Sequence, residues 1–178
     1  MKPADGNVVV TLRRARAADA RGLSRLLVLT WRRTFDGFLS SETIRRVSRR
    51  WHNPKHLLGQ IRDRACYFGV AARGRRLLGL TTVRRTGPGA LFMHRLYVRP
   101  GCQGLGLGEK LLAAAWGAFP RSRRMRLEVL SENARAIGFY RKHGFKVTGR
   151  KPEPVGDEVL DLTVMQAVRP RPRRRAHG

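Results

Sequence analysis

The sequence contains few acidic residues. Its 178 residues include 12 Asp and Glu against 38 Lys and Arg, so that the formal net charge is +26. Only six of the basic residues are lysines. One interpretation is a polyanionic partner such as RNA, because a strongly positive field raises the local concentration of anions and speeds their binding. The other is a compositional bias, which explains the choice of arginine over lysine but not the shortage of acids. Both interpretations stay open.

Cysteines and long apolar runs are also scarce. Cys66 and Cys102 are the two cysteines, and their spacing fits neither a disulfide framework nor a metal site. No apolar run approaches the roughly 20 residues that a membrane-spanning helix needs. The first residues, M-K-P-A-D-G-N, lack the apolar segment of a secretion signal. We therefore expect a cytoplasmic protein that holds no metal, keeps both thiols reduced and does not enter a membrane.

A chain of this length predicts one domain with a sizeable core. We expect this domain to span residues 1–168. The remaining residues, 169–178, read R-P-R-P-R-R-R-A-H-G, with five arginines and no apolar anchor. Such a composition is typical of a disordered basic tail.

The sequence is organised around the stretch 91–119. Residues 91–98 are apolar and rich in β-branched and aromatic side chains, which predicts a strand. A proline and a glycine end that strand, and apolar residues at helical spacing from 107 to 119 predict an amphipathic helix. Between strand and helix lies Q-G-L-G-L-G, residues 103–108. Glycines at a helix start let successive backbone N–H groups converge on a phosphate, which the helix dipole also attracts.

Two common phosphate-binding motifs do not fit this loop. A Walker A loop ends in Gly-Lys-Ser/Thr, but Gly108 is followed by Glu109 and Lys110. The dinucleotide motif G-x-G-x-x-G needs a third glycine where Leu111 stands. The pattern that fits is Q-x-x-G-x-G, from Gln103 to Gly108, directly after a strand that ends L-Y-V-R-P. This arrangement resembles the acyl-CoA-binding motif of the GCN5-related N-acetyltransferase (GNAT) family.

A second stretch carries the same resemblance. Residues 125–145 read M-R-L-E-V-L-S-E-N-A-R-A-I-G-F-Y-R-K-H-G-F. They predict a strand over 125–130 and a helix that begins at Asn133 or Ser131 and ends before Gly144. This segment is similar to the second GNAT signature, L-E-V…N-x-x-A…F-Y-x-x-x-G-F. Two separate motifs in the family's order extend the resemblance over nearly the whole chain.

Hydrophobic periodicity predicts further elements on either side of these motifs. Strands are expected at 8–13, 66–72, 76–84, 145–150 and 158–168, and helices are expected to begin at Asp19, at Ser40 or Ser41, and after the break at Asn53-Pro54, the last over 55–63. A proline-containing connection, 151–157, should join the last two strands. This order implies an α/β fold with a mixed sheet (α+β in character) and helices on both faces. The resemblance implies the GNAT fold, in which the parallel strands 91–98 and 125–130 splay apart.

The resemblance also implies acetyl-CoA (coenzyme A) as the acyl donor and no metal. At the gap between the splayed strands, main-chain groups of Leu96 and Val98 are expected to hold the pantetheine arm as an added strand would. The amides of residues 103–108 are expected to hold the pyrophosphate. The predicted cofactor-binding residues are Leu96, Tyr97, Val98, Gln103, Gly104, Leu105, Gly106, Leu107, Gly108, Asn133, Tyr140 and Lys142. The net positive charge should attract CoA and repel strongly cationic acceptors from all but a locally acidic pocket.

Transfer of an acetyl group from a thioester to an amine needs an acceptor for the amine's proton and a donor for the leaving thiolate. By the resemblance, Tyr140 is expected to protonate the thiolate, and the alternative is a core aromatic. Glu128 is the first candidate for the base, and its alternative is an ion pair with one of the many arginines. His94 is the second, because it lies two residues before Leu96 and should share its face of the strand; the alternative is a satisfied core histidine.

The sequence thus predicts an N-acetyltransferase that moves an acetyl group from acetyl-CoA to a primary amine, either of a peptide or protein amino terminus or of a small molecule. In the family, the segment corresponding to residues 31–51 helps to wall the acceptor pocket. The competing predictions are a nucleic-acid- or ribosome-associated protein on the same fold and a CoA-sensing protein without turnover. The expected partners are an amine acceptor of unknown identity and RNA or the ribosome, bound through the basic surface, and the protein is expected to be a monomer or a homodimer.

Overall fold

The computed structural model of this chain describes residues 9–169. Its strands are β1 (Val10–Arg14), β2 (Cys66–Arg73), β3 (Arg76–Gly87), β4 (Ala90–Val98), β5 (Arg124–Leu130), β6 (Lys146–Val155) and β7 (Glu158–Val168). Its helices are α1 (Ala20–Phe35), α2 (Ser41–Trp51), α3 (Pro54–Arg62), α4 (Leu107–Gly117) and α5 (Ala134–Lys142), and a 3-10 turn, η1 (Ala17–Asp19), precedes α1. Each strand and helix that the periodicity predicts is present, and the main difference is the length of β6.

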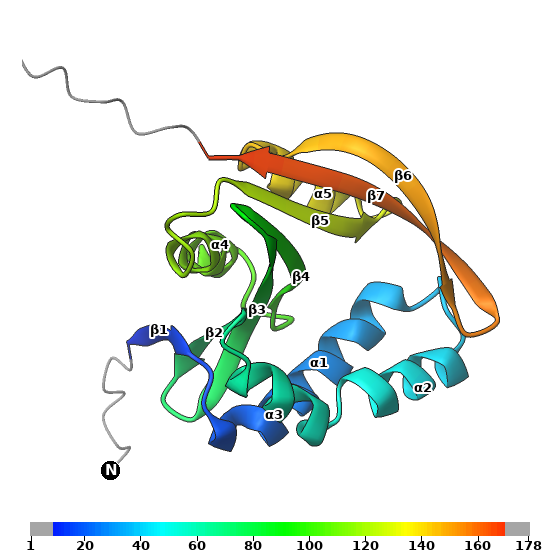
Figure 1. Cartoon of the computed structure of the whole chain (residues 1–178). Coiled ribbons are helices and arrows are strands. Elements are labelled where there is room, and N and C mark those ends of the chain that lie inside the picture. The colour runs from blue at the N-terminus through cyan, green and yellow to red at the C-terminus, as the bar shows by residue number, and fades with distance from the viewer. Residues whose placement is uncertain (1–8, 170–178) are drawn as a thin grey trace, which may run out of the picture.

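The seven strands form one sheet in the order β1-β2-β3-β4-β5-β7-β6. All neighbouring strands are antiparallel except β4 and β5, which are parallel. Helices α1, α2 and α3 lie on one side of the sheet, and α4 and α5 lie on the other (Figure 1). The structure therefore confirms the predicted α/β fold with a mixed sheet and helices on both faces.

Strand alternation divides the core between the two faces of the sheet. Val70 and Leu80 pack with Leu26 of α1 on one face. On the opposite face, Leu111 of α4 packs with Ala71, the residue after Val70 in β2. Burial of one such side chain contributes about 1.5–3 kcal/mol. Because α4 is held to the sheet in this way, the glycine-rich loop that precedes it is held at the end of β4.

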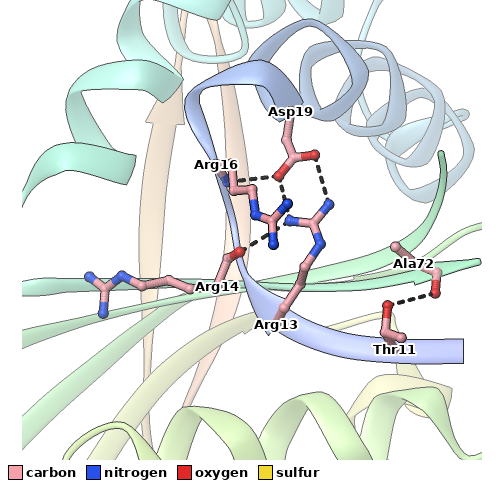
Figure 2. A network of polar contacts seen from close by, with 6 residues as sticks. All are labelled: Thr11, Arg13, Arg14, Arg16, Asp19 and Ala72. Atoms are coloured by element: carbon pink, nitrogen blue, oxygen red, sulfur yellow. Dashed lines mark hydrogen bonds and ion pairs between the residues drawn. The ribbon is translucent and has the colours of Figure 1, made fainter. Parts of the chain in front are cut away.

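One of the few acids ties β1 to the beginning of α1. The Asp19 carboxylate accepts two hydrogen bonds from the Arg13 guanidinium, at 2.7 and 2.9 Å, and a third from the Arg16 backbone N–H at 2.7 Å (Figure 2). The hydrogen bond with Arg13 is the main reason why the pKa of Asp19 lies below its ordinary value. The predicted helix start at Asp19 is confirmed, since this residue ends the 3-10 turn and is the N-cap of α1.

Side-chain caps fix where three other helices begin. Ser40, Asn53 and Asn133 each accept a hydrogen bond from the backbone N–H three residues further on, at 3.2, 2.9 and 3.0 Å. Each cap satisfies one of the N–H groups that the first turn of a helix leaves without an intrahelical partner. The predicted starts of α2 and α3 are confirmed, and of the two candidates for α5, Asn133 rather than Ser131 is the cap.

The predicted proline-containing connection over residues 151–157 is wrong. Strand β6 continues through Pro152 and Pro154 and pairs with β7 as far as Val155. Because β6 is the edge strand of the sheet, the side of its backbone that faces away from β7 needs no hydrogen-bond donors, and a proline is tolerated there. The connection that remains is a tight turn at Gly156 and Asp157.

The predicted tail lies outside the described residues except for its first member, and so does Val8 of the predicted first strand. Arg169 is held against α4, because its guanidinium donates to the backbone carbonyls of Trp116 at 2.7 Å and Pro120 at 3.2 Å and lies over the Trp116 ring. Within residues 9–169, no helix has both the length and the apolar character to cross a membrane. In the same range, no group of three His, Cys, Asp or Glu side chains could hold a metal ion.

Candidate functional site

Strands β4 and β5 separate after four paired residues. Their pairing begins with Ala90 beside Arg124 and ends with Met93 beside Leu127. Beyond this point β4 continues only beside β3, and β5 only beside β7. The sheet is therefore forked at its centre, as the resemblance predicts, and the end of each strand borders an open gap.

Backbone groups of β4 face this gap. The N–H of Arg99 donates to the carbonyl of Leu78 in β3 at 2.7 Å. Successive residues of a strand turn their N–H and C=O groups to opposite edges, so Val98 and Leu96 turn theirs away from β3. A peptide-like chain entering the gap would find these groups without a strand partner.

A cleft of about 540 Å³ extends from this gap to the start of α4. We call it the glycine-loop cleft. Its lining comprises Leu96, Val98, Cys102, Gln103, Gly104, Gly106, Leu107, Gly108, Glu109, Asn133, Arg135, Ala136, Phe139, Tyr140 and Lys142. It thus brings together residues from the end of β4, the glycine-rich loop, the first turn of α4, and α5.

The glycines of the loop are needed for their backbone conformation. Gly104 has a φ of +81° and Gly106, the residue directly before α4, a φ of +69°. A side chain at Gly106 would meet nothing within 4 Å, but residues other than glycine are strained at such a φ. The loop can turn sharply enough for α4 to begin with its N-terminal amides at the cleft.

The charge at the cleft is positive. Glu109 is the one acid among the described lining residues, and it is paired with Lys142 at 3.1 Å and contacts His143 at 3.4 Å. Arg135 also lines the cleft. A helix N-terminus, the Arg135 cation and an acid that Lys142 neutralises form a site suited to anions such as phosphate.

Ten of the predicted cofactor-binding residues line this cleft, and two do not. The two are Tyr97 and Leu105. The Tyr97 side chain lies on the other face of β4, beside the core under α1 and α3, and the Leu105 side chain is 56% exposed. Any contact of Leu105 with a ligand in the cleft would have to come from its backbone.

Tyr140 lies in the wall of the cleft, buried to 8% exposure. It packs against Phe139 and Phe145, with ring centroids 5.3 and 5.5 Å away. Burial, and to a smaller extent the nearby Tyr97, raise the pKa of Tyr140 above its ordinary value. Its hydroxyl is therefore protonated at any pH near neutrality and can act as a hydrogen-bond or proton donor.

A second and larger pocket, of about 930 Å³, opens on the α2 side of the fork. We call it the α2 pocket. The residues that matter below are Trp31, Arg46, Arg50, Trp51, His52, His56, Gln60, Phe92, His94, Arg95, Tyr97, Glu128, Asn133 and Glu153. They come from α1, α2, α3, β4, β5 and the β6–β7 hairpin. Asn133 lines both this pocket and the glycine-loop cleft, so the two spaces meet at the start of α5.

The β6–β7 hairpin closes one side of the α2 pocket. In Figure 1 it reaches across to α2. The Glu158 carboxylate accepts hydrogen bonds from the backbone N–H of Ser40 at 2.8 Å and from its hydroxyl at 3.0 Å. These contacts join the start of β7 to the residue that caps α2.

The predicted shared face of His94 and Leu96 is wrong. The register between β3 and β4 shifts at this point: Thr82 lies opposite Arg95 and Val83 lies opposite Met93, so that His94 forms a bulge. A bulge breaks the alternation of side chains along a strand. Leu96 consequently faces the glycine-loop cleft, whereas His94 faces the α2 pocket.

His94 lies in the concave wall of the α2 pocket. Its side chain is exposed at the opening, and the wall removes part of the water around it. Loss of solvent, together with the nearby Arg95 and Arg84, lowers its pKa to about 4, while Glu128 opposes this change. The imidazole is thus neutral at pH 7 and has a carboxylate nearby. His94 lies directly after Met93, the last residue of β4 that pairs with β5, and so stands at the fork.

Glu128 is the corresponding residue of β5, the first one beyond the pairing with β4. Its side chain is 17% exposed, and its two oxygens are paired with Arg126 and Lys151, each at 3.1 Å. The alternative interpretation of Glu128, an ion pair, is therefore present in the structure. It does not remove Glu128 from the pocket, which the carboxylate still lines together with His94.

The predicted site did not include the side chains on the α3 side of the α2 pocket. His52, His56, Gln60 and Arg95 come together there from α2, α3 and β4. One signal was visible, since Arg95 is a charged residue inside the otherwise apolar strand 91–98. The histidines gave no comparable signal, because their position depends on how α3 packs.

The sequence matches the family model for the acetyltransferase (GNAT) family over residues 23–145. This chain belongs to that family. An L-methionine sulfoximine/L-methionine sulfone acetyltransferase of Pseudomonas aeruginosa is 41% identical over 81 residues, which are 41% of this chain and 45% of that protein. The peptidyl-lysine N-acetyltransferase YjaB of Escherichia coli is 40% identical over 58 residues, 33% of this chain and 37% of that one. The matches thus span less than half the length of these curated relatives.

A solved structure supports the fold over almost the entire chain. The PaiA N-acetyltransferase from Thermoplasma acidophilum, in complex with coenzyme A, superposes with a TM-score of 0.77 at 23% identity. The superposition covers 90% of this chain and 99% of that one. At this level of identity the likeness establishes the shared fold, and the GNAT fold predicted from the two motifs is confirmed.

Proposed function

We propose that this protein is an N-acetyltransferase that transfers an acetyl group from acetyl-CoA to a primary amine by direct attack. The observation that carries the proposal is the forked sheet. On one side of the fork lies a glycine-loop cleft suited to an anionic, amide-containing ligand, and on the other lies a pocket with polar side chains. Two reactants entering from opposite sides would meet at the fork, and such positioning supplies much of the rate acceleration in bimolecular reactions.

The glycine-loop cleft is suited to acetyl-CoA in two ways. The start of α4, together with Lys142 and Arg135, offers N–H groups and positive charge to the pyrophosphate. The outward-turned backbone groups of Leu96 and Val98 offer hydrogen bonds to the amides of the pantetheine arm. The thioester would then lie near the fork, beside Tyr140.

Tyr140 is the proposed acid. As the tetrahedral intermediate collapses, the bond from carbon to sulfur breaks and the thiolate takes a proton. The Tyr140 hydroxyl stays protonated because its pKa is raised, and it lies in the wall of the same cleft.

Glu128 is the proposed base, with His94 as the second candidate. The attacking amine develops positive charge, which a carboxylate stabilises and a neutral imidazole does not. Lys151 and Arg126 hold the Glu128 carboxylate in place at the edge of the fork. His94 lies across the fork from it.

The relatives act on two kinds of primary amine, according to their names: amino-acid analogues, and lysine side chains in peptides. The acceptor of this protein is therefore proposed to be a small-molecule amine or an amine of a peptide or protein. Association with RNA or the ribosome, the cytoplasmic location and the state of monomer or homodimer stay predictions.

The test is release of the CoA thiol from acetyl-CoA in the presence of a panel of amino acids, peptides and amines. We expect thiol release that depends on the amine, and mass spectrometry should find the amine heavier by one acetyl group. Saturable acetyl-CoA binding with no release in the presence of any amine would instead indicate a CoA sensor. Salt-sensitive RNA binding without release would indicate a nucleic-acid-binding protein.

The base is assigned by comparing Glu128→Gln with Glu153→Gln. Both carboxylates line the α2 pocket and both contact Lys151, Glu153 at 2.9 Å. We expect Glu128→Gln to lower kcat about 100-fold and Glu153→Gln to change it less than about three-fold, as general bases contribute on that scale. If His94→Gln shows the large loss and Glu128→Gln the small one, His94 is the base.

A further inference from the structure

Arg95 is a partly buried cation in the wall of the α2 pocket, where the surrounding protein removes much of its water. Its Nη1 donates a hydrogen bond to Oε1 of Gln60 in α3 at 2.7 Å. That amide oxygen is neutral, and none of the ion pairs among residues 9–169 involves Arg95. Arg95 is thus a partly desolvated cation without an anion beside it in the part of the chain that the structure describes.

Such an arrangement is costly for a folded protein. A guanidinium has five N–H donors, and a buried charge is stabilised chiefly by a partner of opposite sign. The other guanidinium nitrogens of Arg95 make no hydrogen bond to a described residue and are not sealed from solvent, so they border the pocket. They are free to receive a planar anion, and carboxylates fit the guanidinium with two parallel hydrogen bonds.

The surrounding pocket does not supply that anion. Its two described carboxylates, Glu128 and Glu153, are already paired with Lys151 and, for Glu128, with Arg126. Arg46 and Arg50 add two more cations to the lining. The positive charge of Arg95 is therefore not neutralised by the pocket and can attract an anionic molecule that enters it.

The groups beside Arg95 reinforce this polarity. The positive charge of Arg95 is a secondary cause, after burial, of the lowered pKa of both His52 and His56. The Nε2 atom of His56 is buried without a hydrogen-bond partner among the described residues. Neutral imidazoles, an unpartnered ring nitrogen and a cation together make a polar surface that an anionic ligand with hydrogen-bonding groups would complete.

We propose that the acceptor is a free amino acid whose carboxylate pairs with Arg95 while its amine reaches the fork at Glu128 and His94. This rests on the proposed acetyltransferase function and names the substrate class of the same pocket. His94 and Arg95 are consecutive residues of β4. The Arg95 cation therefore lies next to the residue that stands at the fork. The aromatic rings of Trp31, Trp51 and Phe92 give the rest of the pocket an apolar wall for the amino acid's side chain.

The same reasoning disfavours polycationic acceptors. A locally acidic pocket would be needed to overcome the net charge of +26, and the α2 pocket contains three arginines against two paired glutamates. Arg95 is accordingly a specificity-determining residue, which selects amines that carry a carboxylate.

The test compares amino acids with their amides in the thiol-release assay. L-methionine, L-leucine and L-phenylalanine are each measured against the corresponding amino-acid amide. We expect kcat/KM to be at least about 10-fold higher for the acid of the best pair, since a hydrogen-bonded charge pair contributes on this scale. Amine reactivity works against this result, because the amide has the less basic amine and more of it is unprotonated at pH 7. A preference for the acid therefore reports recognition of the carboxylate.

Arg95→Gln should remove this preference, and Arg45→Gln should leave it intact. Arg45 is an exposed arginine of α2 that does not line the pocket, so it controls for the loss of one positive charge. Affinity for acetyl-CoA, measured by calorimetry, should be the same in both variants. If Arg95→Gln does not fold, the wild-type ratio of acid to amide decides alone.

Equal or better use of the amides by the wild-type protein overturns the proposal, as does release with amines that lack a carboxylate but with none of the amino acids. Both results leave the acetyltransferase function standing. Absence of release with every amine would contradict the function itself, and absence of acetyl-CoA binding would contradict the assignment of the glycine-loop cleft.

Discussion

The two spaces at the fork are built in different ways. The glycine-loop cleft takes its main features from one continuous stretch, the end of β4, the loop and the start of α4, and it offers backbone N–H groups. The α2 pocket takes single side chains from helices α1, α2 and α3, two central strands and the β6–β7 hairpin. One space is a feature of local sequence, and the other is a feature of packing.

The difference has a functional consequence. Backbone recognition of a phosphate depends on loop shape, which glycines at fixed spacing encode whatever the neighbouring side chains are. Side-chain recognition of an acceptor can change with one substitution on any of several elements. A family can therefore keep one acyl donor while its members differ in acceptor, as the names of the two relatives indicate.

The largest effect should come from breaking the loop. We expect Gly106→Val to weaken acetyl-CoA binding by more than about 100-fold, because a β-branched residue at φ +69° forces the loop out of its shape. Gly89→Val is the matched control, since Gly89 has a φ of +67°, has equally open surroundings and lies in the β3–β4 turn. Both variants should lose similar thermal stability, and calorimetry should find normal acetyl-CoA affinity in Gly89→Val alone. Normal affinity in Gly106→Val would show that the loop's shape is not what binds the cofactor.

A smaller loss of activity is expected from a substitution of the proposed acid, Tyr140. Tyr140→Phe should lower kcat about 100-fold and leave the acetyl-CoA dissociation constant within about two-fold, because the hydroxyl acts only as the thiolate leaves. Tyr67 is half-buried and lines neither the glycine-loop cleft nor the α2 pocket, so Tyr67→Phe should leave kcat unchanged. Steady-state kinetics and calorimetry separate the two quantities. An unchanged kcat in Tyr140→Phe would exclude the hydroxyl from the mechanism.

The α2 pocket should make the protein sensitive to acid. Burial, with smaller contributions from Arg95 and His56, lowers the pKa of His52 to about 4. An unfolded histidine takes up a proton near pH 6.5, so between about pH 6.5 and 4 the unfolded state binds more protons and the free energy of unfolding falls as the pH is lowered. For His52, which is 2% exposed, the loss by pH 4.5 is about 2–3 kcal/mol.

Urea unfolding of His52→Gln at pH 7.5 and 4.5 measures this contribution. The variant should lose less stability between the two pH values than the wild-type protein does. The comparison within each protein cancels the packing defect, including the altered contact with Trp31, whose ring lies 5.2 Å from that of His52. The same acid loss in both proteins would show that His52 does not titrate differently on folding.

The smallest effect is expected at the outer wall of the α2 pocket. Glu158→Gln weakens the two contacts with Ser40 and should raise the KM for the acceptor by about two- to five-fold, a range typical of exposed charge contacts. Affinity for acetyl-CoA should not change, because the contact lies on the other side of the fork. Asp157→Asn is the control: its carboxylate is 96% exposed and 3.7 Å from Arg46, and the substitution should alter neither quantity. Equal effects on donor and acceptor would show that the hairpin supports the whole fold rather than one pocket.

Sequence patterns were most informative where a local signal determines a local structure. The caps at Ser40, Asn53 and Asn133, the glycine loop and the helix after it all follow from neighbouring residues. The patterns failed where the pairing of strands within the sheet determines the structure. Pro152 and Pro154 were assigned to a connection because proline disrupts most strands, but the outer edge of β6 tolerates it. His94 was placed on the face of Leu96 because alternation assumes a regular strand, and the bulge opposite Val83 makes it irregular.

The sequence by itself determined the family's cofactor loop, the order of the elements and the positive charge, because each of these depends on residues that are near one another in the chain or on composition alone. The tertiary structure decided that Arg95 is partly desolvated without a carboxylate beside it, and which polar side chains surround it. That outcome depends on the packing of α3 against β4 and on the reach of the β6–β7 hairpin. Arg95 differs from Arg13, which is also partly buried but is paired with Asp19, because no described carboxylate accompanies the desolvated Arg95 guanidinium.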